Sequence, residues 1–247
     1  MGSCNLSGEG LRLLFLSWPL RYNVSMEPAT ILFLHGFASS GRGTKAQYLR
    51  ERLAGHDGVT FHAFDFNPTP RDFEYLTTSG MINRLRQYLL DRGLAGAAPP
   101  ERMYLVGSSM GGLVALNYAH RFGGIAALLL LAPALTYLSG ERVATAGESW
   151  QDDEGSGDVY HYAFGRPLPL RYDIEVDGRL YQKAPPPPAP MVIVHGRQDQ
   201  VVPVSASRAY ARQYPEQVRL VEVDASHTGL NDNLDLIWNQ LAGLLNR

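Results

Sequence analysis

The chain has 247 residues, of which 45% are hydrophobic and 19% are charged, and its formal net charge is −2. This composition excludes a disordered chain, and the length suffices to bury a sizeable core. Because the charge is near neutral and no basic stripe is present, neither a nucleic acid nor an anionic membrane surface is expected as a partner. The single cysteine, Cys4, excludes an internal disulfide and favours a reducing compartment, so we expect a cytoplasmic protein.

Residues 1–28 are expected to form a tail with one edge strand in the apolar run at residues 11–20. That run is too short to span a bilayer, and it lacks the basic region and cleavage site of a signal peptide. We therefore expect no stable membrane anchor. Translation could start at Met1 or at Met26, and the sequence leaves this open.

Residues 29–247 are expected to form a single domain in which strand-like and helix-like segments alternate. Strands are expected at residues 30–35, 59–64, 102–107, 125–133, 189–196 and 218–224, and helices at residues 44–56, 81–93, 110–123, 204–214 and 233–245. Such alternation predicts an α/β fold with a mostly parallel sheet and helices on both faces.

An insertion at residues 134–188 interrupts this alternation and is rich in Gly, Pro, Tyr and acidic residues. Within it, two strand-like runs about Asp177-Gly178 predict a hairpin over residues 170–182. Ordered insertions of this length are commonly lids or binding elements, so we expect a lid or cap. His161 is expected to lie in a solvated loop, with a position in the pocket as the alternative. The candidate substrate contacts of the insertion are aromatic: Tyr137, Tyr160, Tyr162 and Phe164.

The stretch Gly107-Ser108-Ser109-Met110-Gly111 fits the pattern G-x-S-x-G between a predicted strand and a predicted helix. In this pattern the central serine lies on a sharp, strained turn, and small neighbours leave its hydroxyl exposed. The register selects Ser109 as the nucleophile and makes Ser108 the variable position. A phosphate-binding turn is the alternative, but the sequence lacks the glycine pattern and the following Lys-Ser/Thr that such a turn needs.

A serine hydroxyl needs a base to accept its proton, and the base needs an orienting acid. His227 follows the last predicted strand, and Asp199 follows the preceding one. Each lies beyond the carboxyl end of a strand, where open α/β sheets bind ligands. Asp224 is the rival acid, but its position close to His227 in the chain makes Asp199 the better candidate.

Acyl transfer also needs hydrogen-bond donors for the developing oxyanion. The stretch His35-Gly36-Phe37 follows the first strong strand. The backbone N–H groups of Phe37 and Met110 are the expected donors. His35 is then a residue that shapes the turn and not a second base.

The stretches "LHGFASS", "TKAQYLRERL" and "LVGSSMGG", followed by Asp199 and His227, resemble the α/β-hydrolase superfamily and in particular its small bacterial YqiA-type esterases. The resemblance implies a serine esterase or thioesterase without a cofactor or a metal, and assigns the triad and oxyanion roles to the residues singled out above. The long insertion departs from the smallest members, which leaves the substrate open.

The expected function is therefore hydrolysis of small-molecule carboxylic esters with short to medium acyl chains, through an acyl-enzyme on Ser109. The alternatives are acyl thioester hydrolysis by the same triad and a non-catalytic binding protein on the hydrolase scaffold. Dehalogenases and epoxide hydrolases are disfavoured because they need an aspartate where Ser109 stands. The oligomeric state is left open by the sequence.

Overall fold

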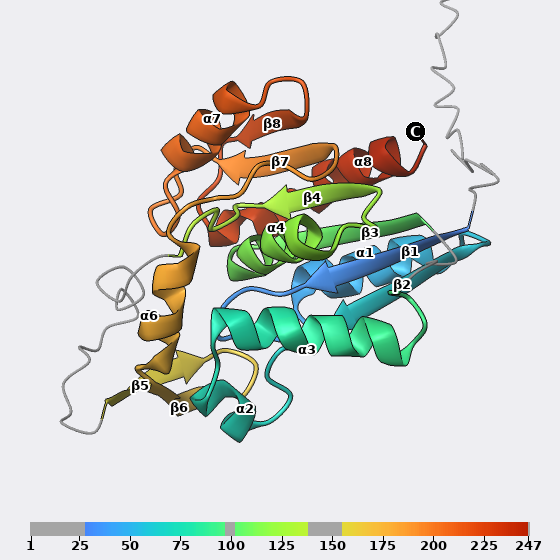
Figure 1. The fold of residues 1–247 in the computed structure, drawn as a ribbon. Coiled ribbons are helices and arrows are strands. Elements are labelled where there is room, and N and C mark those ends of the chain that lie inside the picture. Colours follow the sequence, from blue (N-terminus) through green and yellow to red (C-terminus); the bar gives the residue numbers. More distant parts are fainter. Residues whose placement is uncertain (1–27, 97–101, 138–154, 247) are drawn as a thin grey trace, which may run out of the picture.

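The computed structural model describes residues 28–96, 102–137 and 155–246. At its centre six parallel strands are ordered β2-β1-β3-β4-β7-β8 (Figure 1). These strands are β1 (Ala29–Leu34), β2 (Val59–Phe64), β3 (Arg102–Ser108), β4 (Ala127–Leu131), β7 (Met191–Gly196) and β8 (Val218–Val223). The predicted α/β fold with a parallel sheet is confirmed. The predicted edge strand at residues 11–20, Cys4 and both candidate start sites lie outside the described residues.

Helices cover both faces of the sheet. One face packs against α1 (Thr44–Leu53) and α8 (Leu234–Leu245), and the other against α3 (Thr78–Asp91), α4 (Met110–Phe122) and α7 (Val204–Gln213). Strand β1 is buried along its whole length, and its residues alternate between the two hydrophobic clusters. A strand buried on both faces reads as a continuous apolar run, which is why the sequence predicted these strands well. Within the described ranges, the helices are too short or too polar to cross a bilayer.

A short helix, α2 (Pro70–Glu74), follows β2 and was not predicted from the sequence. Thr69 and Asp72 form a reciprocal capping box at its start, with Pro70 in the first helical position. This combination is a recognised helix-start signal, so the sequence did contain the information. The helix places Phe73 in the core, where the side chain is fully buried.

The described part of the insertion, for which we keep the name cap, contains strands β5 (Ser156–His161) and β6 (Arg166–Arg171), helix α6 (Asp173–Gly178) and a 3-10 helix, η2 (Arg179–Tyr181). It lies beyond the carboxyl ends of the central strands (Figure 1). We call β5, β6 and their turn the cap hairpin.

The predicted hairpin at residues 170–182 is wrong, because most of that segment is helical. Ile174, Gly178 and Tyr181 are buried at helical spacing. Three apolar side chains that contributed to the strand-like pattern are exposed instead: Tyr172, Val176 and Leu180. The observed hairpin lies just before it. Its second strand contains Pro167 and Pro169, which mask the strand signal and are tolerated because an edge strand needs fewer N–H donors.

Candidate active site

Ser109 lies between the end of β3 and the start of α4, with φ 53° and ψ −117°. A non-glycine residue in such a region costs about 1–3 kcal/mol and persists only where its surroundings fix it. Here the Ser109 N–H donates to the Leu131 carbonyl (2.9 Å), and the Ser109 carbonyl accepts from the N–H groups of Gly112 (2.9 Å) and Ala134 (3.1 Å). The strained turn is therefore held by both β4 and the first turn of α4.

The glycines on either side of Ser109 are required by close backbone approach. A Cβ on Gly107 would lie 2.6 Å from the Gly111 carbonyl oxygen. A Cβ on Gly111 would collide with the carbonyl oxygens of Leu34 and His35. Helix α4 can thus begin directly against β1 and β3 only because these two positions lack side chains, as the G-x-S-x-G pattern predicts.

Asp199 follows β7 on a tight loop, and its side chain is fully buried. One carboxylate oxygen, Oδ1, accepts hydrogen bonds from the N–H groups of Val201 (2.9 Å) and Val202 (2.8 Å). Burial acts to raise the pKa of the Asp199 carboxyl, but hydrogen bonds from His195, His227 and the Val202 N–H outweigh it and hold the pKa well below its usual range. The carboxylate is therefore charged at neutral pH.

His227 follows β8 and immediately precedes a 3-10 helix, η3 (Thr228–Asp232). Its Nδ1 lies 2.7 Å from Asp199 Oδ2. A carboxylate only accepts hydrogen bonds, so Nδ1 carries the proton and Nε2 keeps its lone pair. The rival acid, Asp224, instead lies 2.7 Å from Arg197 Nη1, and its side chain is 76% exposed.

A loop of residues 35–40, which we call the oxyanion loop, runs beside the serine. A Cβ on Gly36 would lie 3.3 Å from Ser109 Cβ. The Met110 N–H is the first of α4, where no helical carbonyl can reach it. Among the described residues, nothing accepts a hydrogen bond from the Phe37 N–H. Both predicted oxyanion donors are therefore free to bind another group.

His35 is 2% exposed and shapes this loop from inside. Its Nδ1–H donates to the Gly36 carbonyl (2.8 Å), and its Nε2 accepts from the Phe66 N–H (3.1 Å). Asp65 Oδ1 also lies 3.3 Å from that Nε2. These contacts give His35 a role in fixing the loop.

The predicted substrate contacts fall into two groups. Tyr137 is buried, and its hydroxyl donates to Glu175 Oε1 (3.1 Å), so it packs inside the cap. Tyr160, Tyr162 and Phe164 are exposed on or beside the turn of the cap hairpin. The turn contacts the oxyanion loop.

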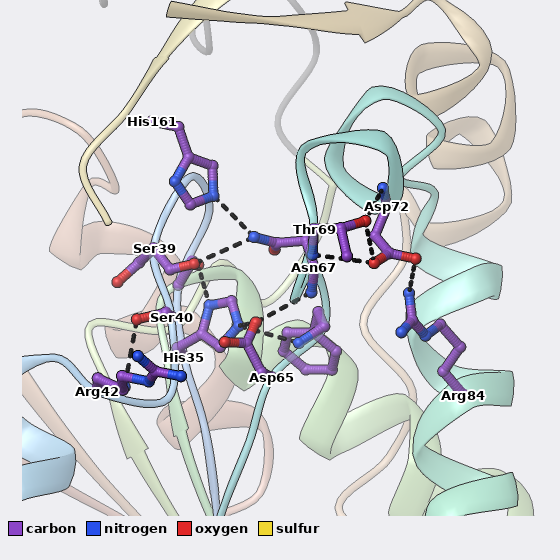
Figure 2. Close-up of polar contacts among 12 residues, drawn as sticks. His35, Ser39, Ser40, Arg42, Asp65, Asn67, Thr69, Asp72, Arg84 and His161 are labelled. Atoms are coloured by element: carbon purple, nitrogen blue, oxygen red, sulfur yellow. Dashed lines mark hydrogen bonds and ion pairs between the residues drawn. The ribbon is translucent and has the colours of Figure 1, made fainter. Parts of the chain in front are cut away.

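The expectation that His161 lies in a solvated loop is wrong, because its side chain has no exposed surface. It ends strand β5 and points inward, where its Nε2 lies 2.7 Å from Asn67 Nδ2 (Figure 2). Asn67 was not singled out from the sequence. No local pattern marks it, because its partners come from distant segments of the chain.

His195 lies in β7, four residues before Asp199. It is fully buried, its Nε2–H donates to the Val202 carbonyl (2.9 Å), and its Nδ1 lies 2.8 Å from Ser207 Oγ. It thus braces the loop that presents Asp199. Across the described ranges, no group of three or more His, Cys, Asp and Glu side chains is placed to hold a metal ion.

The family model described as "Uncharacterised protein family (UPF0227)" matches residues 30–241. No curated protein matches the chain significantly in sequence.

Solved structures resemble it across most of its length. Est1E from Butyrivibrio proteoclasticus, determined with ferulic acid bound, has a TM-score of 0.69 and 22% identity, over 92% of this chain and 93% of that one. A monoacylglycerol lipase from Paleococcus ferrophilus has a TM-score of 0.64 and 17% identity, over 88% and 94%. Mouse alpha/beta hydrolase domain-containing protein 10 has a TM-score of 0.63 and 19% identity, over 88% and 89%. These likenesses show the α/β-hydrolase fold.

Proposed function

The chain belongs to the UPF0227 family and has the α/β-hydrolase fold, and from this premise we propose that it is a serine hydrolase of carboxylic esters. The preferred substrates are esters with short to medium acyl chains. Ser109 is the nucleophile, His227 the general base and acid, and Asp199 the orienting carboxylate. The N–H groups of Phe37 and Met110 bind the oxyanion.

The observation that carries the proposal is the Asp199–His227 pair, at 2.7 Å, presented by the loops after β7 and β8. The pair leaves His227 Nε2 as the acceptor on a side chain that is 20% exposed. It lies at the same edge of the sheet as the strained Ser109 turn, because the carboxyl ends of parallel strands share one edge. A purely structural histidine would not need a fully buried, charged partner in this position.

In the proposed reaction His227 Nε2 takes the Ser109 proton as Oγ attacks the acyl carbonyl carbon. The tetrahedral oxyanion accepts hydrogen bonds from the Phe37 and Met110 N–H groups. His227 then gives its proton to the leaving alcohol, and the acyl group stays on Ser109 as an ester. Water, deprotonated by the same histidine, attacks the acyl-enzyme and releases the acid. Asp199 stabilises the imidazolium each time His227 holds the extra proton.

The exposed aromatic side chains of the cap hairpin, Tyr160, Tyr162 and Phe164, are the proposed contacts for the acyl or alcohol group. The Tyr162 N–H donates to the Ala38 carbonyl of the oxyanion loop (2.9 Å), which brings the hairpin close to the proposed site and supports an apolar substrate. Because the similar Est1E structure holds ferulic acid, a hydroxycinnamate ester belongs among the substrates to be tested.

The test is hydrolysis of matched esters and thioesters, with acyl chains from two to sixteen carbons, by wild type, Ser109→Ala and Ser108→Ala. Ser108 ends β3 beside the nucleophile and is the matched control. We expect Ser109→Ala to lower kcat by about 10⁴-fold or more, and Ser108→Ala to change it little. The chain-length optimum ranks the substrates, and the ratio of ester to thioester turnover decides between esterase and thioesterase.

Wild-type turnover retained by Ser109→Ala would refute the proposal. If neither protein hydrolyses any substrate, labelling by a fluorophosphonate distinguishes the remaining readings. Labelling of wild type but not of Ser109→Ala indicates an activated serine with a narrow substrate. No labelling favours the binding-protein alternative.

A further inference from the structure

A buried polar cluster joins the cap hairpin to the oxyanion loop (Figure 2). It consists of His35 in the oxyanion loop, Asp65 and Asn67 after β2, and His161 at the end of β5. His35 and Asn67 are 2% exposed, and His161 is completely buried. The reaction proposed above uses none of these side chains, although the cluster directly borders the oxyanion donor Phe37.

Asn67 is the centre of the cluster. Its Nδ2 donates to the Ser39 carbonyl (3.3 Å) and to His161 Nε2 (2.7 Å), and its backbone N–H donates to Asp65 Oδ1 (3.1 Å). One amide nitrogen thus binds the oxyanion loop on one side and the cap hairpin on the other, as Figure 2 shows. His161 accepts this bond only as a neutral ring. Burial and the nearby His35 lower the pKa of His161, and Asp65 only partly opposes this.

Two further contacts also connect the cap hairpin with the oxyanion loop. The Tyr162 N–H donates to the Ala38 carbonyl (2.9 Å), so two successive carbonyls of the oxyanion loop are bound, one by the cap hairpin and the other by Asn67. The His161 ring meets Phe73 edge-on, with centroids 4.7 Å apart, and Phe73 lies 5.6 Å from the Phe37 ring. The side chain of the oxyanion donor is therefore packed, through Phe73, against the same histidine.

These contacts matter because the loop has an unfavourable backbone conformation. Ala38 has φ 49°, a region that a non-glycine residue adopts only when its surroundings enforce it. The carbonyls of Ala38 and Ser39 follow directly after the Phe37 donor. If either were released, the loop could relax and turn the Phe37 N–H away from the oxyanion.

We infer that Asn67 and His161 are positioning residues that hold the oxyanion loop in its reactive conformation by linking it to the cap hairpin. The inference rests on the proposed ester hydrolysis and assigns no bond-making step to either residue. If the inference holds, the cap contributes to catalysis by positioning the oxyanion loop, in addition to contacting the substrate. A cap that merely bound substrate would affect KM, whereas a misplaced oxyanion donor weakens only the transition state and lowers kcat.

The test compares three variants with wild type. His161→Leu removes the acceptor for the Asn67 amide, whereas His161→Gln supplies a carbonyl oxygen that can replace it. Asn67→Asp keeps the size of the side chain but removes the donor to the Ser39 carbonyl. His62→Leu is the matched control, because His62 is a half-buried histidine bonded to the Tyr88 hydroxyl (3.0 Å) on the outer strand β2.

We expect kcat to fall about 10- to 100-fold in His161→Leu and Asn67→Asp, with KM within about threefold of wild type. His161→Gln should recover most of this loss, and His62→Leu should retain wild-type kcat. Hydrogen exchange provides a second readout, because the Tyr162 amide should lose protection in His161→Leu and Asn67→Asp as its bond to the Ala38 carbonyl weakens. Circular dichroism and thermal unfolding check that each variant is folded. If His161→Leu does not fold, the other two variants decide.

A folded His161→Leu or Asn67→Asp with kcat within twofold of wild type would overturn the inference. A loss confined to KM, or the same loss in His161→Gln and His62→Leu, would overturn it as well. The proposed hydrolysis is judged separately, since it stands or fails with the activity of wild type and Ser109→Ala.

Discussion

Replacing Asp199 by Asn tests the most specific contact of the candidate site. Asp199 Oδ1 accepts from two backbone N–H groups, at 2.9 and 2.8 Å, so the asparagine carbonyl oxygen will occupy that position. The amide NH₂ must then face His227 Nδ1, which is 2.7 Å from Oδ2 in the native protein. An NH₂ group can only donate, so His227 must accept at Nδ1 and carry its proton on Nε2. The proposed general base is then held in the wrong tautomer.

The size of the effect follows from that tautomer. In serine hydrolases with this arrangement, the same change lowers kcat by about 10⁴-fold with little change in geometry. At about 1.4 kcal/mol for each factor of ten, this corresponds to about 5.5 kcal/mol of lost transition-state stabilisation. The fold should survive, because the substitution is nearly isosteric and keeps both backbone hydrogen bonds.

The assay measures kcat and KM for the best ester, with Asp224→Asn as the matched control. Asp224 is the other acid close to His227 in the chain, but it pairs with Arg197 at the surface. We expect Asp224→Asn to have wild-type kcat. A folded Asp199→Asn with kcat within tenfold of wild type would refute the reasoning, and a large loss in Asp224→Asn alone would identify Asp224 as the orienting acid.

Two further predictions concern stability. The pKa of the Asp199 carboxyl is lower in the folded chain than its ordinary value of about 4. The charged carboxylate therefore stabilises the fold fully above about pH 4, and this stabilisation is lost as the pH falls toward the lower pKa of the folded chain. We therefore expect the free energy of unfolding in urea to fall less between pH 7 and pH 3 for Asp199→Asn than for wild type. Equal decreases in the two proteins would contradict the low pKa assigned to Asp199. Gly111→Ala should cost about 1–3 kcal/mol or prevent folding, because the new Cβ meets the Leu34 and His35 carbonyl oxygens. Gly243 is exposed on helix α8 and a Cβ there has open space, so Gly243→Ala should stabilise the chain by about 0.4–1 kcal/mol. Similar effects of both changes would refute the steric argument.

The sequence predicted the parallel sheet because its strands are buried on both faces. Such strands are short continuous apolar runs, and the helices between them repeat at their own period. Helix α3 illustrates the limit of this reading. It begins at Thr78, three residues before the predicted start at residue 81, because the Thr77 side chain accepts from the Gly80 N–H (3.0 Å) and caps it.

The secondary structure of the cap could not be predicted from hydrophobic periodicity in the same way. The cap has little apolar core of its own, and its segments take their structure from what they pack against. The helical turn at Gly178 fits there because the Tyr137 ring occupies the space that a side chain would need. That contact joins residues far apart in the chain, and no local pattern encodes it.

Two local features of the candidate site could be predicted from the sequence: the glycine-flanked Ser109 turn, and polar residues at the ends of successive strands. These features follow from backbone sterics and from the topology of a parallel sheet, and each can be recognised within a short stretch of sequence. Which of these groups contact one another depends on the tertiary structure. It paired His227 with Asp199 and turned Asp224 toward Arg197, and it buried His161 against Asn67 beneath the oxyanion loop. This is because the hydrogen bonds join residues 27 to 94 positions apart, and such contacts exist only once the chain has folded.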